Sequence, residues 1–264
     1  MRVCDQRNLI QEILFFVRWQ LWLVLLSLPY HVAFCARGLG DRRTGFWKRA
    51  HLAGQVLWIH LRIPCIHAPG ELLAIIEEVV TLPASMPGVI VECGCYQGGS
   101  TAKLSLAARI ANRQLIVCDS FQGLPQPGMS DRVDEKEAFQ SGDFASRLEE
   151  VERNVRRHGN PDVVRYVLGW YQETLDQLSG IDIACVFLDV DLEESITVCL
   201  HKLWKSISPG CKVFVHDVDR PPVVRPFQDQ EWWSSHFNSP IPPFVGSGHG
   251  LGWQKRLLGY SIKP

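Results

Sequence analysis

A short, strongly apolar stretch that runs into a glycine-rich turn constrains the fold of this chain more than any other feature. Residues 89–93 read Val-Ile-Val-Glu-Cys, and the turn after them contains Gly94, Gly98 and Gly99 before Ser100 opens a helical pattern. A continuous apolar run of this length is typical of a parallel strand buried on both faces. The free N–H groups of the following helix, together with glycines that admit a ligand to the backbone, predict a binding site at this turn.

The spacing of the glycines discriminates between ligands. A dinucleotide-binding turn needs glycine at its first, third and sixth positions, but the third position from Gly94 is Tyr96. A P-loop is excluded because no Gly-Lys-Ser/Thr follows. An acid at the strand end, one glycine and then a glycine pair favour S-adenosylmethionine instead. We therefore expect Glu92, Gly94, Gly98 and Ser100 to bind this cofactor, with Ser100 also as the N-cap of its helix.

Beyond the turn, apolar runs alternate with helical patterns, which predicts a parallel sheet flanked by helices. The expected strands are residues 89–93, 115–118, 163–168, 183–188 and 212–215. The expected helices are residues 47–66, broken at Pro64, and residues 71–81, 100–111, 144–158, 172–178 and 193–206.

The prominent acids, Glu92, Asp119, Asp189 and Asp217, all lie at predicted strand ends. Ligands bind outside the carboxyl ends of the strands in such a sheet, so this placement predicts one shared site. Asp119 follows the glycine pair by about twenty residues, where a carboxylate can accept both hydroxyls of an adenosine ribose; a helix-capping Asp is the alternative. Gly169-Trp170 follow the third strand and are expected to flank the adenine, unless Trp170 belongs to the core.

The ends of the fourth and fifth strands carry a candidate metal site. Asp189, His216 and Asp217 are the expected ligands of a divalent ion such as Mg²⁺, which prefers carboxylates and water. The alternative is that Asp191 caps the next helix and His216 bonds within the protein. Asp191 and His216 are also the candidate general bases. The ordinary pKa of histidine is near neutral, which suits His216 for this role. His249 is a third candidate.

Five motifs carry a resemblance to a known family. They are Val91-Glu-Cys-Gly-Cys-Tyr-Gln-Gly-Gly-Ser100, Asp119-Ser-Phe-Gln-Gly-Leu-Pro125, Gly169-Trp-Tyr-Gln-Glu-Thr-Leu175, Leu188-Asp-Val-Asp-Leu-Glu-Glu-Ser195 and Pro209-Gly210. In their order and spacing, over roughly residues 85–260, the chain resembles the macrocin O-methyltransferase family of class I methyltransferases, which methylate sugar hydroxyls.

This resemblance implies a Rossmann-like α/β fold with a mostly parallel seven-stranded sheet. It assigns Glu92, Gly94, Asp119 and Ser120 to S-adenosylmethionine, and it assigns Asp189 with the acid pair after the fifth strand to a Mg²⁺ ion. This chain departs from the pattern of the family at three places. The first of the two acids is His216, the Asp-Gly-Asp run is Asp189-Val-Asp191, and the aromatic residue shortly afterwards is Glu193.

Residues 1–50 differ from the rest in charge, with eight Lys or Arg against three Asp or Glu in a chain of net charge −1. Within residues 8–34, apolar positions recur at three- and four-residue steps, which predicts an amphipathic helix. Its run Leu21–Leu28 is shorter than the roughly 20 residues of a membrane span. Three arrangements stay open: packing on the domain or on a second copy in a homodimer, peripheral contact with a membrane, and a true span.

We divide the chain into a helical extension, residues 1–50, and a methyltransferase domain, residues 51–264. The latter comprises leading helices at 51–85 and the core at 86–264. The net charge gives no reason to expect nucleic acid binding. Nine cysteines without a paired CxxC motif argue against zinc and indicate a reduced, cytoplasmic protein, with membrane association through residues 8–34 left open.

The expected function is methyl transfer from S-adenosylmethionine to a hydroxyl of a sugar or a glycosylated small molecule, assisted by Mg²⁺. Two alternatives remain. One is a methyltransferase acting on a membrane-associated or lipid-linked glycan, and the other is a non-catalytic cofactor-binding protein of the same fold.

Overall fold

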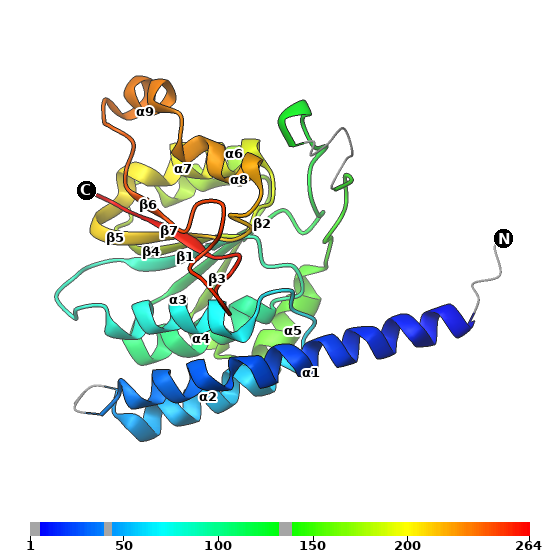
Figure 1. Cartoon of the computed structure of the whole chain (residues 1–264). Coiled ribbons are helices and arrows are strands. Elements are labelled where there is room, and N and C mark those ends of the chain that lie inside the picture. Colours follow the sequence, from blue (N-terminus) through cyan, green and yellow to red (C-terminus); the bar gives the residue numbers. More distant parts are fainter. Residues whose placement is uncertain (1–5, 40–43, 132–138) are drawn as a thin grey trace.

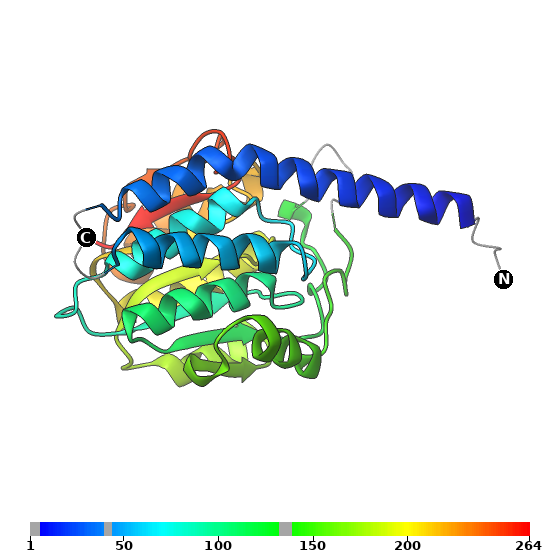
Figure 2. The ribbon, with the colours of Figure 1, turned by 90° about the horizontal axis from the view of Figure 1, so that it is seen from below.

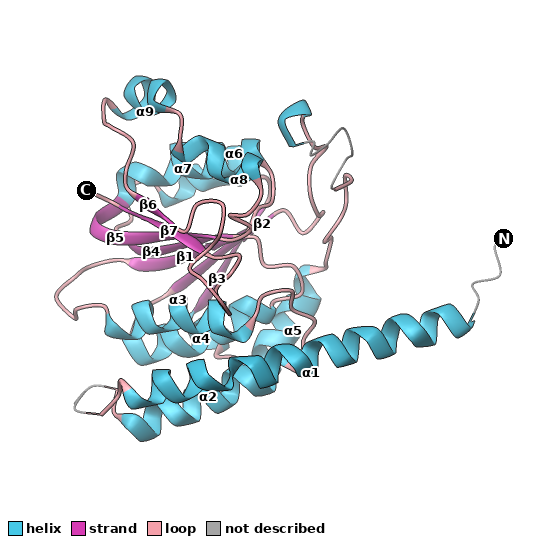
Figure 3. Ribbon diagram, viewed as in Figure 1, coloured by secondary structure: helices cyan, strands magenta, loops and turns pink. Residues whose placement is uncertain are grey.

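A seven-stranded sheet forms the centre of the computed structural model, which describes residues 6–39, 44–131 and 139–264 (Figures 1 and 3). The strands are β1 Val89–Cys93, β2 Leu115–Asp119, β3 Val164–Leu168, β4 Ile183–Leu188, β5 Ile207–Val215, β6 Phe244–Val245 and β7 Gly259–Ile262. Their order is β3-β2-β1-β4-β5-β7-β6. The first five are parallel, whereas β7 runs antiparallel to β5 and to β6. The mostly parallel, seven-stranded sheet is therefore confirmed.

Helices cover both faces of this sheet (Figure 1). One face carries α1 Gln6–Ala36, α2 Phe46–His60, α3 Pro69–Thr81, α4 Gly99–Ala111 and α5 Leu148–His158. The other carries α6 Tyr171–Thr174, α7 Glu193–Leu203 and α8 Pro221–Val224, with α9 Gln230–Phe237 beyond them. Short 3₁₀ turns occupy Met129–Asp131, Pro161–Val163, Leu175–Leu178, Trp204–Ser206 and Arg225–Phe227.

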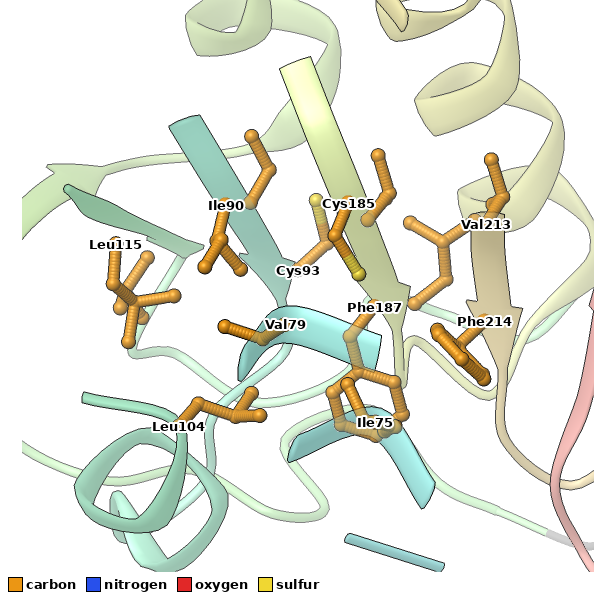
Figure 4. Close-up of a cluster of buried hydrophobic side chains, with 14 of the residues drawn as sticks. Ile75, Val79, Ile90, Cys93, Leu104, Leu115, Cys185, Phe187, Val213 and Phe214 are labelled. Carbon is orange, nitrogen blue, oxygen red and sulfur yellow. The ribbon is translucent and has the colours of Figure 1, made fainter. Parts of the chain in front are cut away.

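The core lies between the sheet and these two layers. Every residue of β4 is buried, as the uninterrupted apolar run of this strand predicts. Figure 4 shows side chains of β1, β4 and β5 in one buried cluster with Ile75 and Val79 of α3 and Leu104 of α4. This cluster holds the strands rigidly, so that their carboxyl ends form a fixed edge for the loops described below.

The glycine turn departs from expectation at its helix start. The N-cap of α4 is Gly98, in a left-handed conformation with φ 81°, so Ser100 lies inside the first turn and the predicted cap is wrong. Glycine takes this conformation without strain. Gly94 is needed for another reason, because a Cβ there would come within 1.9 Å of the Asp189 carbonyl oxygen. The turn is thus pressed against the end of β4.

The helix predicted at residues 47–66 is shorter in the structure. We expected it to reach residue 66, but α2 ends at His60. The residue before a proline disfavours helical geometry, and Pro64 follows soon after. The chain therefore enters a loop at residues 61–68 before Pro69 starts α3. Two smaller differences are that α5 begins at Leu148, four residues late, and that β5 begins before Pro209-Gly210.

The helix expected within residues 8–34 is present as α1 and packs on α2 and α3, but its predicted amphipathic pattern is wrong, because polar side chains are buried on the packed face and apolar ones are exposed. Its N-terminal part extends past the other helices (Figure 2). The buried positions are Gln20, Leu23, Ser27, His31 and Phe34. The exposed apolar positions, here called the α1 stripe, are Leu21, Trp22, Leu25, Leu28 and Val32.

No helix in the described part of the chain is both long enough and apolar enough to cross a bilayer. The predicted boundary at residue 50 falls inside α2, and the division of the chain into an extension and a domain stays a prediction. Residues 1–5 and 40–43 of the predicted extension lie outside the described residues.

Candidate active site

A pocket opens at the carboxyl ends of the central strands. Ten of the twelve predicted site residues line it: Gly94, Ser100, Asp119, Ser120, Gly169, Trp170, Asp189, Asp191, His216 and Asp217. Glu92 and Gly98 do not. His249 is exposed on a loop and is not part of the lining either. The acids at the strand ends therefore share one cavity, as their common placement predicted.

Asp119 is held rigidly at the end of β2. Its Oδ2 accepts a hydrogen bond from the backbone N–H of Cys95 at 2.8 Å, and its Oδ1 accepts one from the N–H of Phe121 at 2.7 Å. No helix starts at this residue, so the alternative of a helix-capping Asp is wrong. Each oxygen keeps a second acceptor position, which suits two neighbouring hydroxyls of a ribose. Ser120 supports the same turn through its hydroxyl, which donates to the Gly123 carbonyl.

Aromatic side chains form one wall of the pocket. Trp170 is half-buried at the cavity rather than in the core, which excludes the core alternative. Phe144 lies against Tyr96 and Phe139, with ring centroids 5.7 Å and 5.6 Å apart. A helix was predicted from residue 144 onward, but Phe144 lies in the loop before α5 with φ 61°. This wall supplies apolar area next to the polar strand ends.

Glu92 lies behind the pocket surface, fully buried at the end of β1. Neither carboxylate oxygen has a hydrogen-bond partner among the described residues. Burial raises the pKa of Glu92 to about 7, against a smaller lowering by the Ser100 and Thr101 hydroxyls. A buried carboxyl without a partner is costly unless a cation or a donor approaches it. Glu92 is therefore a buried acid beneath the Gly94 turn, next to the Ser100 and Thr101 hydroxyls.

Around Asp189 the pocket contains a cluster of ionisable side chains, only some of which were predicted from the sequence. His67 Nε2 lies 2.9 Å from Asp189 Oδ2, and His216 Nδ1 lies 3.2 Å from Asp189 Oδ1. These three residues are the His67–Asp189–His216 cluster, whose donor atoms all lie within 4.8 Å of one another. Asp217, the third predicted ligand, lies 3.0 Å from His216 Nδ1 but does not belong to this group. His67, on the 61–68 loop, takes its place.

The charges within the cluster shift the pKa values of its three members. Burial opposes the charge on His67, but the Asp189 carboxylate outweighs it and raises the pKa of His67 to about 10. Burial likewise opposes the charge on His216, yet Asp189 raises the pKa of His216 well above its ordinary value. Burial alone would raise the pKa of Asp189, and the two histidines lower it instead. His216 therefore holds its proton at neutral pH in this arrangement, which argues against the near-neutral base expected from the sequence.

Each histidine has an anionic partner on its other nitrogen. Cys65 Sγ lies 3.3 Å from His67 Nδ1 and accepts from the Lys103 ammonium at 3.3 Å. Burial would raise the pKa of Cys65, but Lys103 and then His67 lower it well below its ordinary value. On the other side, a carboxylate oxygen of Glu71 lies 3.5 Å from His216 Nε2. No sequence signal marked Cys65, Lys103 or Glu71, because none belongs to a recognisable motif.

Asp191 sits beside the cluster with φ 59°. Arg220 donates to its carbonyl oxygen at 3.0 Å. Burial, and then the carboxylates of Asp189 and Asp217, raise the pKa of Asp191 well above its ordinary value. The alternative role as a helix cap is wrong, since the first N–H of α7 donates to the Asp131 carboxylate at 2.8 Å instead. The Asp191 carboxylate lines the pocket, with the Arg220 guanidinium 3.7 Å away.

These donors do not fit Mg²⁺ well. Two of the three atoms in the cluster are imidazole nitrogens, whereas Mg²⁺ is held by oxygen ligands and keeps several waters. The expected Mg²⁺ site is thus built differently in this chain from the carboxylate site that the resemblance implied.

Comparison with known proteins agrees with the fold. The model of the macrocin O-methyltransferase (TylF) family matches residues 70–241. A tetracenomycin-C 4'-O-methyltransferase of Streptomyces olivaceus, whose named substrate bears a 2,3-dimethoxy-α-L-rhamnosyl group, is 34% identical over 143 residues. That match covers 52% of this chain and 55% of the relative. The demethyldecarbamoylnovobiocin O-methyltransferase of Streptomyces niveus is 32% identical over 187 residues, covering 68% of this chain and 70% of the relative.

The solved structure of the O-methyltransferase NovP superimposes with a TM-score of 0.57 at 27% identity, covering 72% of this chain and 76% of that one. The Rossmann-like class I fold and the resemblance seen in the sequence are both confirmed. The chain spans only about half the length of the first relative named above. On its family model, its relatives and its fold, this chain belongs to the macrocin O-methyltransferase family.

Proposed function

We propose that this protein transfers a methyl group from S-adenosylmethionine to a hydroxyl of a sugar or of a sugar-bearing small molecule. The observation that carries the proposal is the union of two sites in one pocket, with the anchored Asp119 in one part and the His67–Asp189–His216 cluster in the other. A donor and an acceptor held in the same cavity can be aligned for in-line displacement. The named activity of the relatives, O-methylation of glycosylated compounds, supports the same class of acceptor.

Binding of the cofactor is assigned to the glycine turn and its neighbours. Asp119 accepts hydrogen bonds from the two ribose hydroxyls, and Trp170 with Gly169 flanks the adenine. Gly94 and Ser100 line the methionine end. Bound S-adenosylmethionine supplies an electrophilic methyl group on a sulfonium. Glu92, behind that end, provides the buried negative charge toward which the ammonium group is oriented.

Deprotonation of the acceptor hydroxyl falls to Asp191. A carboxylate with a raised pKa takes up a proton more readily, which is what a poor nucleophile such as a sugar hydroxyl requires. Asp191 removes the proton as the oxygen attacks the methyl carbon, while the wall around Phe144 excludes water from the reacting atoms. Arg220, which binds the Asp191 carbonyl, fixes the position of the base.

Two measurements test this proposal. Isothermal titration of the full chain with S-adenosylmethionine and S-adenosylhomocysteine should give one site per chain. Release of S-adenosylhomocysteine should then be followed over a panel of glycosides and their aglycones, with turnover expected only for the glycosides. Absence of cofactor binding would overturn the proposal, and binding without turnover on any glycoside would favour the non-catalytic alternative.

A second candidate acceptor, a lipid-linked or membrane-associated glycan, is favoured by the α1 stripe. Leu25 is 60% exposed and Val32 68% exposed, and Ile66, which lines the pocket, is 57% exposed. An apolar helix face with aromatic and basic neighbours binds at a membrane interface. Under this candidate the protein lies on the cytoplasmic side of a membrane. Cell fractionation before and after deletion of residues 21–28 tests it against a cytoplasmic enzyme, and sedimentation of the purified chain tests whether the stripe instead joins two copies.

A further inference from the structure

The His67–Asp189–His216 cluster has the dimensions of a metal site. The donor atoms of adjacent residues are 2.9 Å and 3.2 Å apart. Tetrahedral ligands at about 2.0–2.2 Å from an ion lie about 3.3–3.6 Å from one another, so only small side-chain shifts would admit an ion here. The three side chains come from the 61–68 loop and from the ends of β4 and β5, so they approach one point from different directions.

The contacts within the cluster are short ion pairs between imidazole nitrogens and the Asp189 carboxylate. His67 Nε2 and both ring nitrogens of His216 are buried, and none of them has a well-aligned hydrogen bond among the described residues. Buried nitrogens of this kind, with a carboxylate between them, are available to an ion that enters the pocket.

The surroundings orient both rings for metal binding. A metal-ligating histidine almost always donates its other ring N–H to an acceptor, which fixes the tautomer. His67 Nδ1 faces the Cys65 sulfur at 3.3 Å, and that sulfur is charge-paired with the fully buried Lys103. His216 Nε2 faces Glu71, whose carboxylate is itself fixed by the N–H groups of Ala68 and Leu257. His67 therefore has an outer partner on Nδ1, whereas Glu71 orients His216 from 3.5 Å by charge and leaves Nδ1 facing Asp189 and Asp217.

We propose that His67, Asp189 and His216 bind one divalent transition-metal ion, with Zn²⁺ as the representative, in preference to Mg²⁺. Two imidazoles and one carboxylate are ligands that suit Zn²⁺ and its neighbours, and three protein ligands leave a position open to the pocket. The absence of paired CxxC motifs excludes only a cysteine-ligated zinc site. The ligands proposed here are histidine and aspartate side chains that are far apart in sequence. The role of such an ion, lowering the pKa of a bound hydroxyl, rests on the proposed function, whereas its binding does not.

Metal binding can be measured on the full chain without cofactor or acceptor. After chelator treatment and dialysis, the protein should be titrated calorimetrically with Zn²⁺, Co²⁺ and Mg²⁺. We expect one Zn²⁺ per chain, bound at least a hundredfold more tightly than Mg²⁺, and a visible Co²⁺ spectrum of nitrogen and oxygen ligation. Equal affinity for Mg²⁺, or no stoichiometric binding of any ion, would overturn the proposal and leave a metal-free ion-paired cluster.

Variants identify the site. His67→Gln and His216→Gln should each abolish stoichiometric Zn²⁺ binding, while the matched exposed variant His249→Gln should bind as the unchanged protein does. Cys65→Ser removes an outer partner only, and should weaken Zn²⁺ binding by about 10- to 100-fold. Zn²⁺ binding that survives in the His67→Gln/His216→Gln double variant would assign the ion to another site and refute the proposal.

A substitution that changes the metal preference, instead of abolishing binding, is a control for variants that lose Zn²⁺ because they do not fold. His216→Asp restores the two-acid pattern that the family resemblance implies, and should shift the preference from Zn²⁺ toward Mg²⁺. An unchanged preference would contradict the role of His216. Titration of the same preparations with S-adenosylhomocysteine separates the two proposals, because loss of cofactor binding with intact Zn²⁺ binding would overturn the function and not the metal site.

Discussion

The Nε2 atom of His67 lies 2.9 Å from a carboxylate oxygen of Asp189, although one residue precedes the sheet and the other ends its fourth strand. The loop between α2 and α3 carries His67 over the carboxyl edge of the sheet. The helices before the sheet are therefore part of the pocket and not only a scaffold attached to it.

Replacing Asp119 by Ala should weaken binding of S-adenosylhomocysteine at least tenfold. The substitution removes a charged acceptor for two hydroxyls, and charge-assisted hydrogen bonds are among the strongest. Calorimetric titration measures the change, and Asp162→Ala, an exposed acid outside the pocket, is the matched control. An unchanged affinity would remove Asp119 from the cofactor site.

Asp189→Asn should lower turnover by at least a hundredfold while the cofactor still binds. The change keeps the size of the side chain but removes the charge that both histidines face. A loss in kcat with an unaltered dissociation constant for S-adenosylhomocysteine separates the acceptor half of the pocket from the cofactor half. Retained turnover, with and without added metal, would show that the cluster takes no part in the reaction.

Glu92→Gln should make the cofactor-free protein more stable at alkaline pH. The pKa of Glu92 is raised from 4.5 to about 7 in the folded state, so folding favours its protonated form. The stability that this proton contributes is present in full below the unfolded pKa and is lost as the pH rises through 7. At 1.36 kcal/mol per unit, the wild-type protein loses up to about 3 kcal/mol across this window.

The Gln side chain cannot ionise, so the advantage of the variant should be near zero at pH 4.5 and grow between pH 5 and 8. Urea unfolding at several pH values measures this difference, with the exposed Glu149→Gln as control. A difference that does not change with pH would mean that Glu92 keeps an ordinary pKa. We also expect the variant to bind S-adenosylmethionine more weakly, because the buried charge is lost.

Cys65→Ala should destabilise the protein by about 3 kcal/mol, because it leaves the fully buried Lys103 without its anionic partner. The double variant Cys65→Ala/Lys103→Met should be more stable than the single one, since the uncompensated charge is then gone. A double-mutant cycle by urea unfolding of the metal-free chain gives the coupling between the two residues. Equal unfolding free energies of the single and double variants would refute the charge pairing.

The part of the pocket proposed to bind the cofactor could be predicted from the sequence to a large extent. The strand at residues 89–93, the glycine turn and Asp119 are local patterns, and an acid at the end of a parallel strand must lie at the carboxyl edge of the sheet. The exceptions were details of local geometry. Ser100 does not cap its helix because Gly98, two residues earlier, takes the left-handed conformation and is the N-cap, and helical periodicity carries no information on such a choice.

The composition of the proposed metal site was decided by tertiary structure. Asp189 and His216 could be brought together from strand order, but their third partner could not, because the position of His67 depends on where α2 ends and on how its loop returns to α3. The outer partners Cys65, Lys103 and Glu71 are likewise joined only by packing.

The sequence by itself therefore determined the sheet, its carboxyl edge and the residues that line the cofactor end, since apolar periodicity and glycine spacing are local properties. Only the folded chain determined the composition of the His67–Asp189–His216 cluster. Its donors come from segments that share no local pattern and meet because the core holds α3, β4 and β5 against one another.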